Sequence, residues 1–150
     1  MTVVDGAARK AEGATGLGEG ATEVAALARA GEPDRYLAAL LAPPPQREAL
    51  LALAAFGAEL ARIPRRAVRE PFMGEVRLQW WRTALGLDDV GGDSGGHAVA
   101  VAMRAAVRSH DLPGATLNDM IDAHAHELRP APSQDDAAVN DFLDKTEGAL

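Results

Sequence analysis

The chain has 150 residues, of which 47% are apolar, and it carries a formal net charge of −7. These values describe one globular domain that can bury a core, without an apolar run long enough for a transmembrane helix. The acidic balance argues against a nucleic-acid-binding protein. Because the chain has no cysteine, disulfide bonds, thiolate metal sites and a cysteine nucleophile are excluded.

The charges are unevenly distributed along the chain. Residues 45–85 hold seven arginines against four glutamates, whereas residues 111–150 hold nine acidic residues against Arg129 and Lys145. We expect these two segments to attract each other, or a partner, through their opposite charges.

The first thirty residues are predicted to be a flexible leader. Five glycines interrupt a mixture of alanine, threonine and glutamate that has little apolar surface to bury. Order is expected to begin near Val24 or Asp34, so the folded domain is predicted to span residues 31–150.

The rest of the chain is predicted to be all-α, because alanine, leucine and arginine fill its segments and no alternating strand pattern interrupts them. Prolines and glycines divide it into about six helices. These helices are predicted near residues 36–41, 45–63, 71–85, 98–110, 115–129 and 135–150.

Two of these helices show a predicted core face. In the segment 45–63 this face consists of Leu50, Leu53, Gly57 and Leu60. In the segment 71–85 it consists of Leu78, Trp81 and Leu85. The adjacent Trp80 points about 100° away from Trp81, so we expect neighbouring elements to cover this helix over a wide arc.

Two strings of sequence resemble a known family. They are AAFGAELAR at residues 54–62 and GEVRLQWWR at residues 74–82. Both are similar to the squalene/phytoene synthase family of head-to-head isoprenyl diphosphate transferases, and in particular to the branch of phytoene-synthase-like assembly factors of mitochondrial complex I. The resemblance implies an isoprenoid synthase-like helical bundle. Since that domain is about twice as long, this chain is expected to be its N-terminal half.

The chain departs from the family at its first aspartate-rich motif. Ala58 stands where the resemblance implies an arginine, and Ala61, Arg62 and Arg65 stand where it implies three aspartates that bind Mg²⁺. Mg²⁺ requires oxygen ligands, which arginine lacks. The second aspartate motif of the family lies beyond residue 150. We therefore expect no metal site or cofactor in this chain, whereas a complete active synthase would use Mg²⁺.

Several charged residues are candidates for substrate binding. Arg47 keeps an arginine that the family has after a proline. Arg62 and Arg65 either bind an anion directly or lie on a solvated surface, where ion pairs contribute only about 0–1 kcal/mol. Glu59 either forms a buried pair with Arg77 or Arg82, or is exposed; the sequence leaves both open.

Aromatic residues complete the candidate list. Trp80 and Trp81 could line an isoprenoid pocket, although aromatic residues at helical spacing usually belong to a core. His124 continues an apolar helix face and is either a core or cavity-edge histidine or, by analogy with the family, a substrate contact. The spacing of His124 and His126 does not suit a metal pair on one helix face.

Two functional hypotheses from different classes follow. The first is a non-catalytic member of the family that binds an isoprenoid, a lipid or a protein partner, as assembly factors do. The second is the N-terminal part of an active, Mg²⁺-dependent prenyl transferase. The substitutions at the aspartate motif favour the first. We expect a cytoplasmic protein, or one peripheral at a membrane, and self-association if apolar faces are left uncovered.

Overall fold

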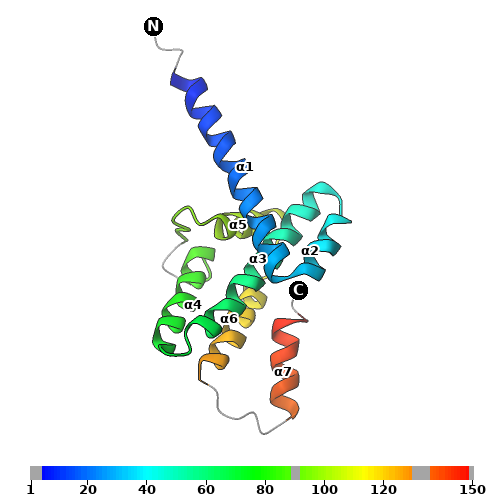
Figure 1. The fold of residues 1–150 in the computed structure, drawn as a ribbon, viewed down its shortest axis with the longest axis vertical. Helices are drawn as coiled ribbons and strands as arrows, with labels where there is room; N and C mark the ends of the chain where they lie inside the picture. Colours follow the sequence, from blue (N-terminus) through cyan, green and yellow to red (C-terminus); the bar gives the residue numbers. More distant parts are fainter. Residues whose placement is uncertain (1–4, 89–91, 130–135, 149–150) are drawn as a thin grey trace.

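The structure is a computed structural model that describes residues 5–88, 92–129 and 136–148. Within these ranges it is all-α, as predicted (Figure 1). Its helices are α1 (Asp5–Gly31), α2 (Pro33–Leu40), α3 (Pro44–Arg66), α4 (Pro71–Leu85), α5 (Ala98–His110), α6 (Gly114–Leu128) and α7 (Asp136–Thr146). None of these described helices is both long enough and apolar enough to cross a membrane.

Helix α3 is the centre of the bundle, because α1, α2, α4, α5 and α6 all pack against it. Its buried side consists largely of alanines, which allow neighbouring helices to approach closely, and two large side chains, Phe56 and Leu60, are fully buried among them. Complete burial of each of these two side chains contributes roughly 1.5–3 kcal/mol. The wider core includes Val24, Ala28, Leu78, Trp81, Val99, Met103, Leu117, Met120 and Ile121.

Most helix bounds follow the local signals of the sequence. Helices α4 and α5 have the bounds that were predicted, and Gly86 ends α4 in the left-handed conformation that glycine adopts readily. The main difference is at the end of α3, which was predicted to stop at Pro64 but continues to Arg66. A proline in the last turn removes one backbone hydrogen bond without preventing the few residues after it from remaining helical.

The prediction of a flexible leader over residues 1–30 differs from the structure, in which helix α1 begins at Asp5. The N-terminal part of α1 extends beyond the other helices (Figure 1). Its C-terminal part packs on α3 and α5 through the buried residues Val24 and Ala28, one helical turn apart. Tertiary packing of this turn outweighs the low helix propensity of the glycines that precede it. Residues 1–4 lie outside the described ranges.

Two predicted core faces are only partly correct. In α3, Leu50 is exposed rather than buried, and the core face instead follows Ala49, Ala52 and Phe56. In α4, Leu78, Trp81 and Leu85 are buried as predicted. The expectation that neighbours cover α4 over a wide arc is wrong, because Phe72, Val76 and Trp80 on its other side are exposed.

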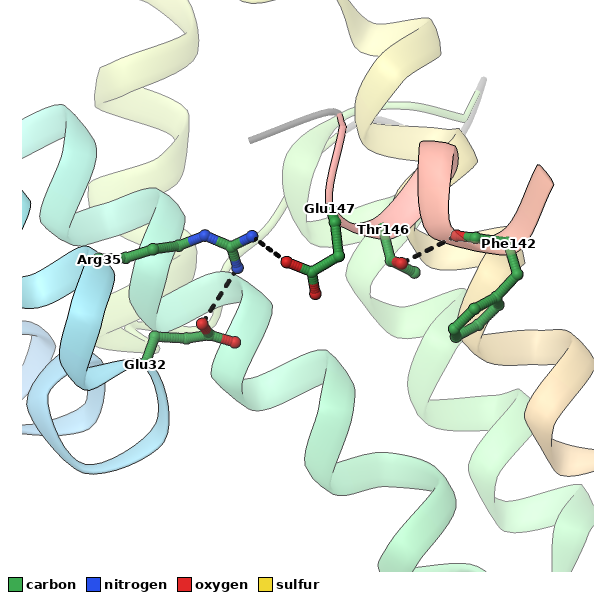
Figure 2. A network of polar contacts seen from close by, with 5 residues as sticks. All are labelled: Glu32, Arg35, Phe142, Thr146 and Glu147. Atoms are coloured by element: carbon green, nitrogen blue, oxygen red, sulfur yellow. Dashed lines mark hydrogen bonds and ion pairs between the residues drawn. The ribbon is translucent and has the colours of Figure 1, made fainter. Parts of the chain in front are cut away.

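Ion pairs join parts of the chain that are far apart in sequence. Arg82 of the basic segment pairs with Asp122 of the acidic segment, which is the kind of attraction that their charges predict. Figure 2 shows a second network, in which Arg35 of α2 donates to Glu32 at 3.1 Å and to Glu147, just after α7, at 2.6 Å. Arg35 therefore connects the end of α7 to α2.

Two glycines of α1 should respond in opposite ways to a methyl group. A Cβ atom on Gly31 would lie 2.3 Å from the Cβ of Ala58, whereas one on Gly20 would meet only Ala98 at 3.9 Å. We expect Gly31→Ala to lower the free energy of unfolding by about 1–3 kcal/mol through overpacking. Gly20→Ala should raise it by up to about 1 kcal/mol through helix propensity. Urea unfolding followed by circular dichroism measures both, and equal effects would contradict the close contact of α1 with α3.

Candidate functional site

A pocket of about 250 Å³ lies between α3, α4 and the start of α5. We call it the Arg–Trp pocket. It is lined by Glu59, Arg62, Ile63, Arg66, Arg77, Trp80, Trp81 and His97. It therefore brings together four of the seven predicted site residues, namely Glu59, Arg62, Trp80 and Trp81.

Helical spacing explains why these side chains meet. The lining residues of α3 are spaced three, four and seven positions after Glu59, and those of α4 are spaced three and four positions after Arg77, so each set lies on one helix face. His97 directly precedes α5 as its N-cap residue. The pocket is thus formed by one face of α3, one face of α4 and the residue that precedes α5.

Aromatic rings form one wall of the Arg–Trp pocket. Trp81 packs edge-on against Phe56 of the core at a centroid distance of 5.1 Å, and Trp80 and Trp81 are 5.0 Å apart. The His97 ring lies 5.3 Å from each tryptophan. Trp81 is only 3% exposed whereas Trp80 is 37% exposed. Trp81 therefore belongs to the core, as its helical spacing indicated. Trp80 provides an apolar surface that a ligand can reach.

The opposite wall is positively charged. Arg62 donates to Glu59 at 2.6 Å, one turn away on the same helix. A pair of Glu59 with Arg77 or Arg82, one of the two alternatives that the sequence left open, does not form, because Arg62 is closer along α3 and Arg82 is held by Asp122. Within the described residues, Arg66 and Arg77 have no ion-pair partner. Three arginines and one glutamate thus leave the pocket with an excess of positive charge.

A second hollow of about 490 Å³ continues from the first one and shares Arg66 and Arg77 with it. Its other lining residues are Ala67, Arg69, Glu70, Met73 and Gly74, at the end of α3 and the start of α4. It again combines three arginines with a single glutamate. The guanidinium groups of Arg66 and Arg77 can therefore reach an anion that enters from either side.

The other three predicted site residues lie elsewhere. Arg47 donates from Nε and Nη2 to the carbonyl oxygen of Ala42, at 3.2 and 3.0 Å, across the connection between α2 and α3. Arg65 is exposed and does not line the Arg–Trp pocket. The Nδ1 atom of His124 is 2.7 Å from Glu127, and its ring packs against Phe142 of α7. The structure does not bring these three residues together.

Four residues of the pocket were not among the predicted site residues, namely Ile63, Arg66, Arg77 and His97. Arg66 is one of the seven arginines of residues 45–85, and Arg77 is considered above only as a possible partner of Glu59. His97 carried no sequence signal, and its Nδ1 atom is buried without a hydrogen-bond partner among the described residues. Helical spacing from Glu59 and Trp80 could have identified the two arginines, but only the fold places His97 beside them.

The residues of the Arg–Trp pocket do not fit Mg²⁺. Its only carboxylate, on Glu59, is already paired with Arg62, and its arginines repel a cation and offer no lone pair. In the described parts of the chain, no three histidine, aspartate or glutamate side chains are grouped closely enough to hold a metal ion. Ala58, at the position where the resemblance implies an arginine, is buried beneath Gly31 of α1.

Comparison with known proteins agrees with the family resemblance of the two sequence strings in α3 and α4. A family model described as squalene/phytoene synthase matches residues 28–150. The chain belongs to the squalene/phytoene synthase family. Membership accounts for the all-α fold. Of Ala61, Arg62 and Arg65, which stand where the resemblance implies aspartates, Arg62 lines the Arg–Trp pocket. No solved structure matches the chain significantly.

Two curated relatives of the chain carry the same name. The chain is 30% identical over 145 residues to "NADH dehydrogenase (ubiquinone) complex I, assembly factor 6" of Bos taurus, an alignment that covers 95% of this chain and 43% of that protein. It is 28% identical over 116 residues to the Homo sapiens protein of the same name, covering 77% of this chain and 34% of the relative. The chain thus spans less than half the length of these relatives.

The two tryptophans should differ sharply in their contribution to stability. Trp81→Ala removes a buried side chain that packs on Phe56, so we expect the free energy of unfolding to fall by about 3–5 kcal/mol. Trp80→Ala should cost no more than about 1–2 kcal/mol because its side chain is partly exposed. Urea unfolding of the two variants tests this contrast. Equal losses would show that Trp80 is covered in solution and is not available to a ligand.

Proposed function

We propose that this chain is a non-catalytic member of the squalene/phytoene synthase family that acts as an assembly factor for a respiratory complex I. The names of its relatives support a role of this kind. The observation that carries the proposal is the charge of the Arg–Trp pocket, where Arg62 occupies a position that the family resemblance gives to an aspartate. The chain keeps the helical fold of the family, but an arginine stands where the resemblance implies a metal-binding aspartate.

The replaced wall supports binding without turnover. In a prenyl transferase, metal ions hold the diphosphate and help it to leave. Guanidinium groups such as those of Arg66 and Arg77 bind phosphate oxygens directly. The lining of the pocket lacks the group of carboxylates that would recruit a metal ion. A ligand with an anionic head and an apolar body would place its head near these arginines and its body against Trp80.

The second candidate is an active, Mg²⁺-dependent prenyl transferase, and family membership is the observation that favours it. The two candidate functions differ in whether the protein releases pyrophosphate, which can be measured. We expect the longest native form of the protein, incubated with farnesyl or geranylgeranyl diphosphate and Mg²⁺, to release no pyrophosphate above the rate without protein. A squalene synthase assayed in parallel is the positive control. Mg²⁺-dependent release that is lost when a native aspartate motif is mutated would overturn the non-catalytic proposal.

The assembly role has its own test in the source organism. We expect deletion of the gene to lower the amount of fully assembled complex I on native gels, with NADH dehydrogenase activity falling in proportion. Expression of the wild-type protein should restore both. The double variant Arg66→Gln/Arg77→Gln should restore them poorly, because it removes the two guanidinium groups of the Arg–Trp pocket that have no ion-pair partner among the described residues. The exposed-surface variant Arg108→Gln should restore them fully. Unchanged complex I after deletion would contradict the proposed role.

A further inference from the structure

Helix α4 has a second apolar face that the fold does not use. Phe72, Val76 and Trp80 are spaced four residues apart and form a line along the exposed side of the helix. Val68, just before α4, and Met73, beside the line, extend it, and Val68 and Phe72 are 77% and 71% exposed. We call these five residues the outer face of α4.

The outer face is separate from the side of α4 that stabilises the bundle. Gly74, Leu78 and Trp81 point into the core, and helix α4 packs on α3, α5 and α6 through that side. Removal of the Phe72 or Val76 side chain would therefore leave the core contacts unchanged, whereas Trp80 also packs against Trp81. Contiguous exposed apolar side chains on one helix face are unusual in a soluble protein and mark an interaction surface.

Unpaired arginines border this apolar line. Arg66, Arg69 and Arg77 have no ion-pair partner among the residues that the structure describes. They line the hollow of about 490 Å³ together with Met73 of the outer face and one acidic residue, Glu70. Nearby Glu75 is neutralised by Arg129 at 2.6 Å. A chain with a net charge of −7 thus concentrates free positive charge beside its exposed apolar line.

We propose that the outer face of α4 docks onto the surface of an anionic phospholipid bilayer. Phe72, Val76 and Trp80 enter the boundary between headgroups and acyl chains, where aromatic side chains are favoured, while Arg66, Arg69 and Arg77 bind lipid phosphates. Charge complementarity selects this partner, because local positive charge attracts an anionic surface and orients the otherwise acidic chain with α4 toward it. The inference goes beyond the assembly role and requires neither catalysis nor a particular protein partner.

Vesicle binding tests the proposal. We expect the chain to co-sediment with vesicles of phosphatidylcholine and phosphatidylglycerol, and much less with phosphatidylcholine alone. Arg69→Gln should weaken binding to the anionic vesicles about fivefold, the effect of one basic residue near such a surface. Phe72→Ser should weaken it by about tenfold or more because a large apolar side chain no longer inserts. Leu41→Ser is the matched control, since Leu41 is 90% exposed at the end of α2, away from α4, and this variant should bind like wild type.

Fluorescence provides a second readout that does not depend on sedimentation. The chain has two tryptophans, and only the partly exposed Trp80 can change its surroundings on docking. Anionic vesicles should shift the emission to shorter wavelength, and Trp80→Phe should abolish the shift. Circular dichroism of each variant checks that the helices are intact.

Three outcomes would overturn the lipid assignment. The first is equal binding to zwitterionic and anionic vesicles, and the second is an equal loss in Phe72→Ser and Leu41→Ser. The third is no vesicle binding together with self-association that Phe72→Ser removes, as measured by light scattering, which would assign the outer face to a second copy of the chain. None of these outcomes bears on pyrophosphate release or on complex I levels, so the proposed function is tested separately.

Discussion

Close packing of small residues along α3 is the constraint on which the rest of the structure depends. Alanines on its buried side let five other helices approach it, and the tightest contact places Gly31 of α1 directly over Ala58. Because packed interiors tolerate little added volume, this contact determines which side chains α3 can carry at that level. A long side chain at position 58 would displace α1. The small residue at this position, where the resemblance implies an arginine, therefore goes together with the close packing of the N-terminal helix.

The same helix determines the electrostatics of the site. Beside its buried alanines, α3 carries Glu59, Arg62 and Arg66, which line the Arg–Trp pocket opposite the tryptophans. Glu59 neutralises Arg62 locally, and the remaining guanidinium groups are left for a ligand. Helix α3 thus contributes both the close packing at the centre of the bundle and part of the positive charge of the pocket. The close packing and the pocket lining use different faces of α3.

Local signals predicted much of the architecture. Proline at the first turn of α4 and glycine after its last turn mark its bounds, and the spacing of Leu78 and Trp81 identified its core face. What could not be predicted depends on neighbours. The spacing places Trp81 on the core face, but it does not show how far neighbouring elements cover Trp80. The partner of Glu59 and the position of His97 follow from how α3, α4 and α5 meet, and α1 is held by packing that glycine content alone does not reveal.

The bond between Arg35 and Glu147 has a consequence for the order of folding. It joins residues 112 positions apart, whereas α1, α2 and α3 are neighbours in sequence and pack on one another. Loop closure over a long distance costs more chain entropy than contacts between successive helices, so we expect the contact of α7 with α2 to form after the N-terminal helices have packed. An element held by such a late contact is also expected to open early in native-state fluctuations. Exchange of its amide hydrogens would therefore proceed while the α3 core stays closed.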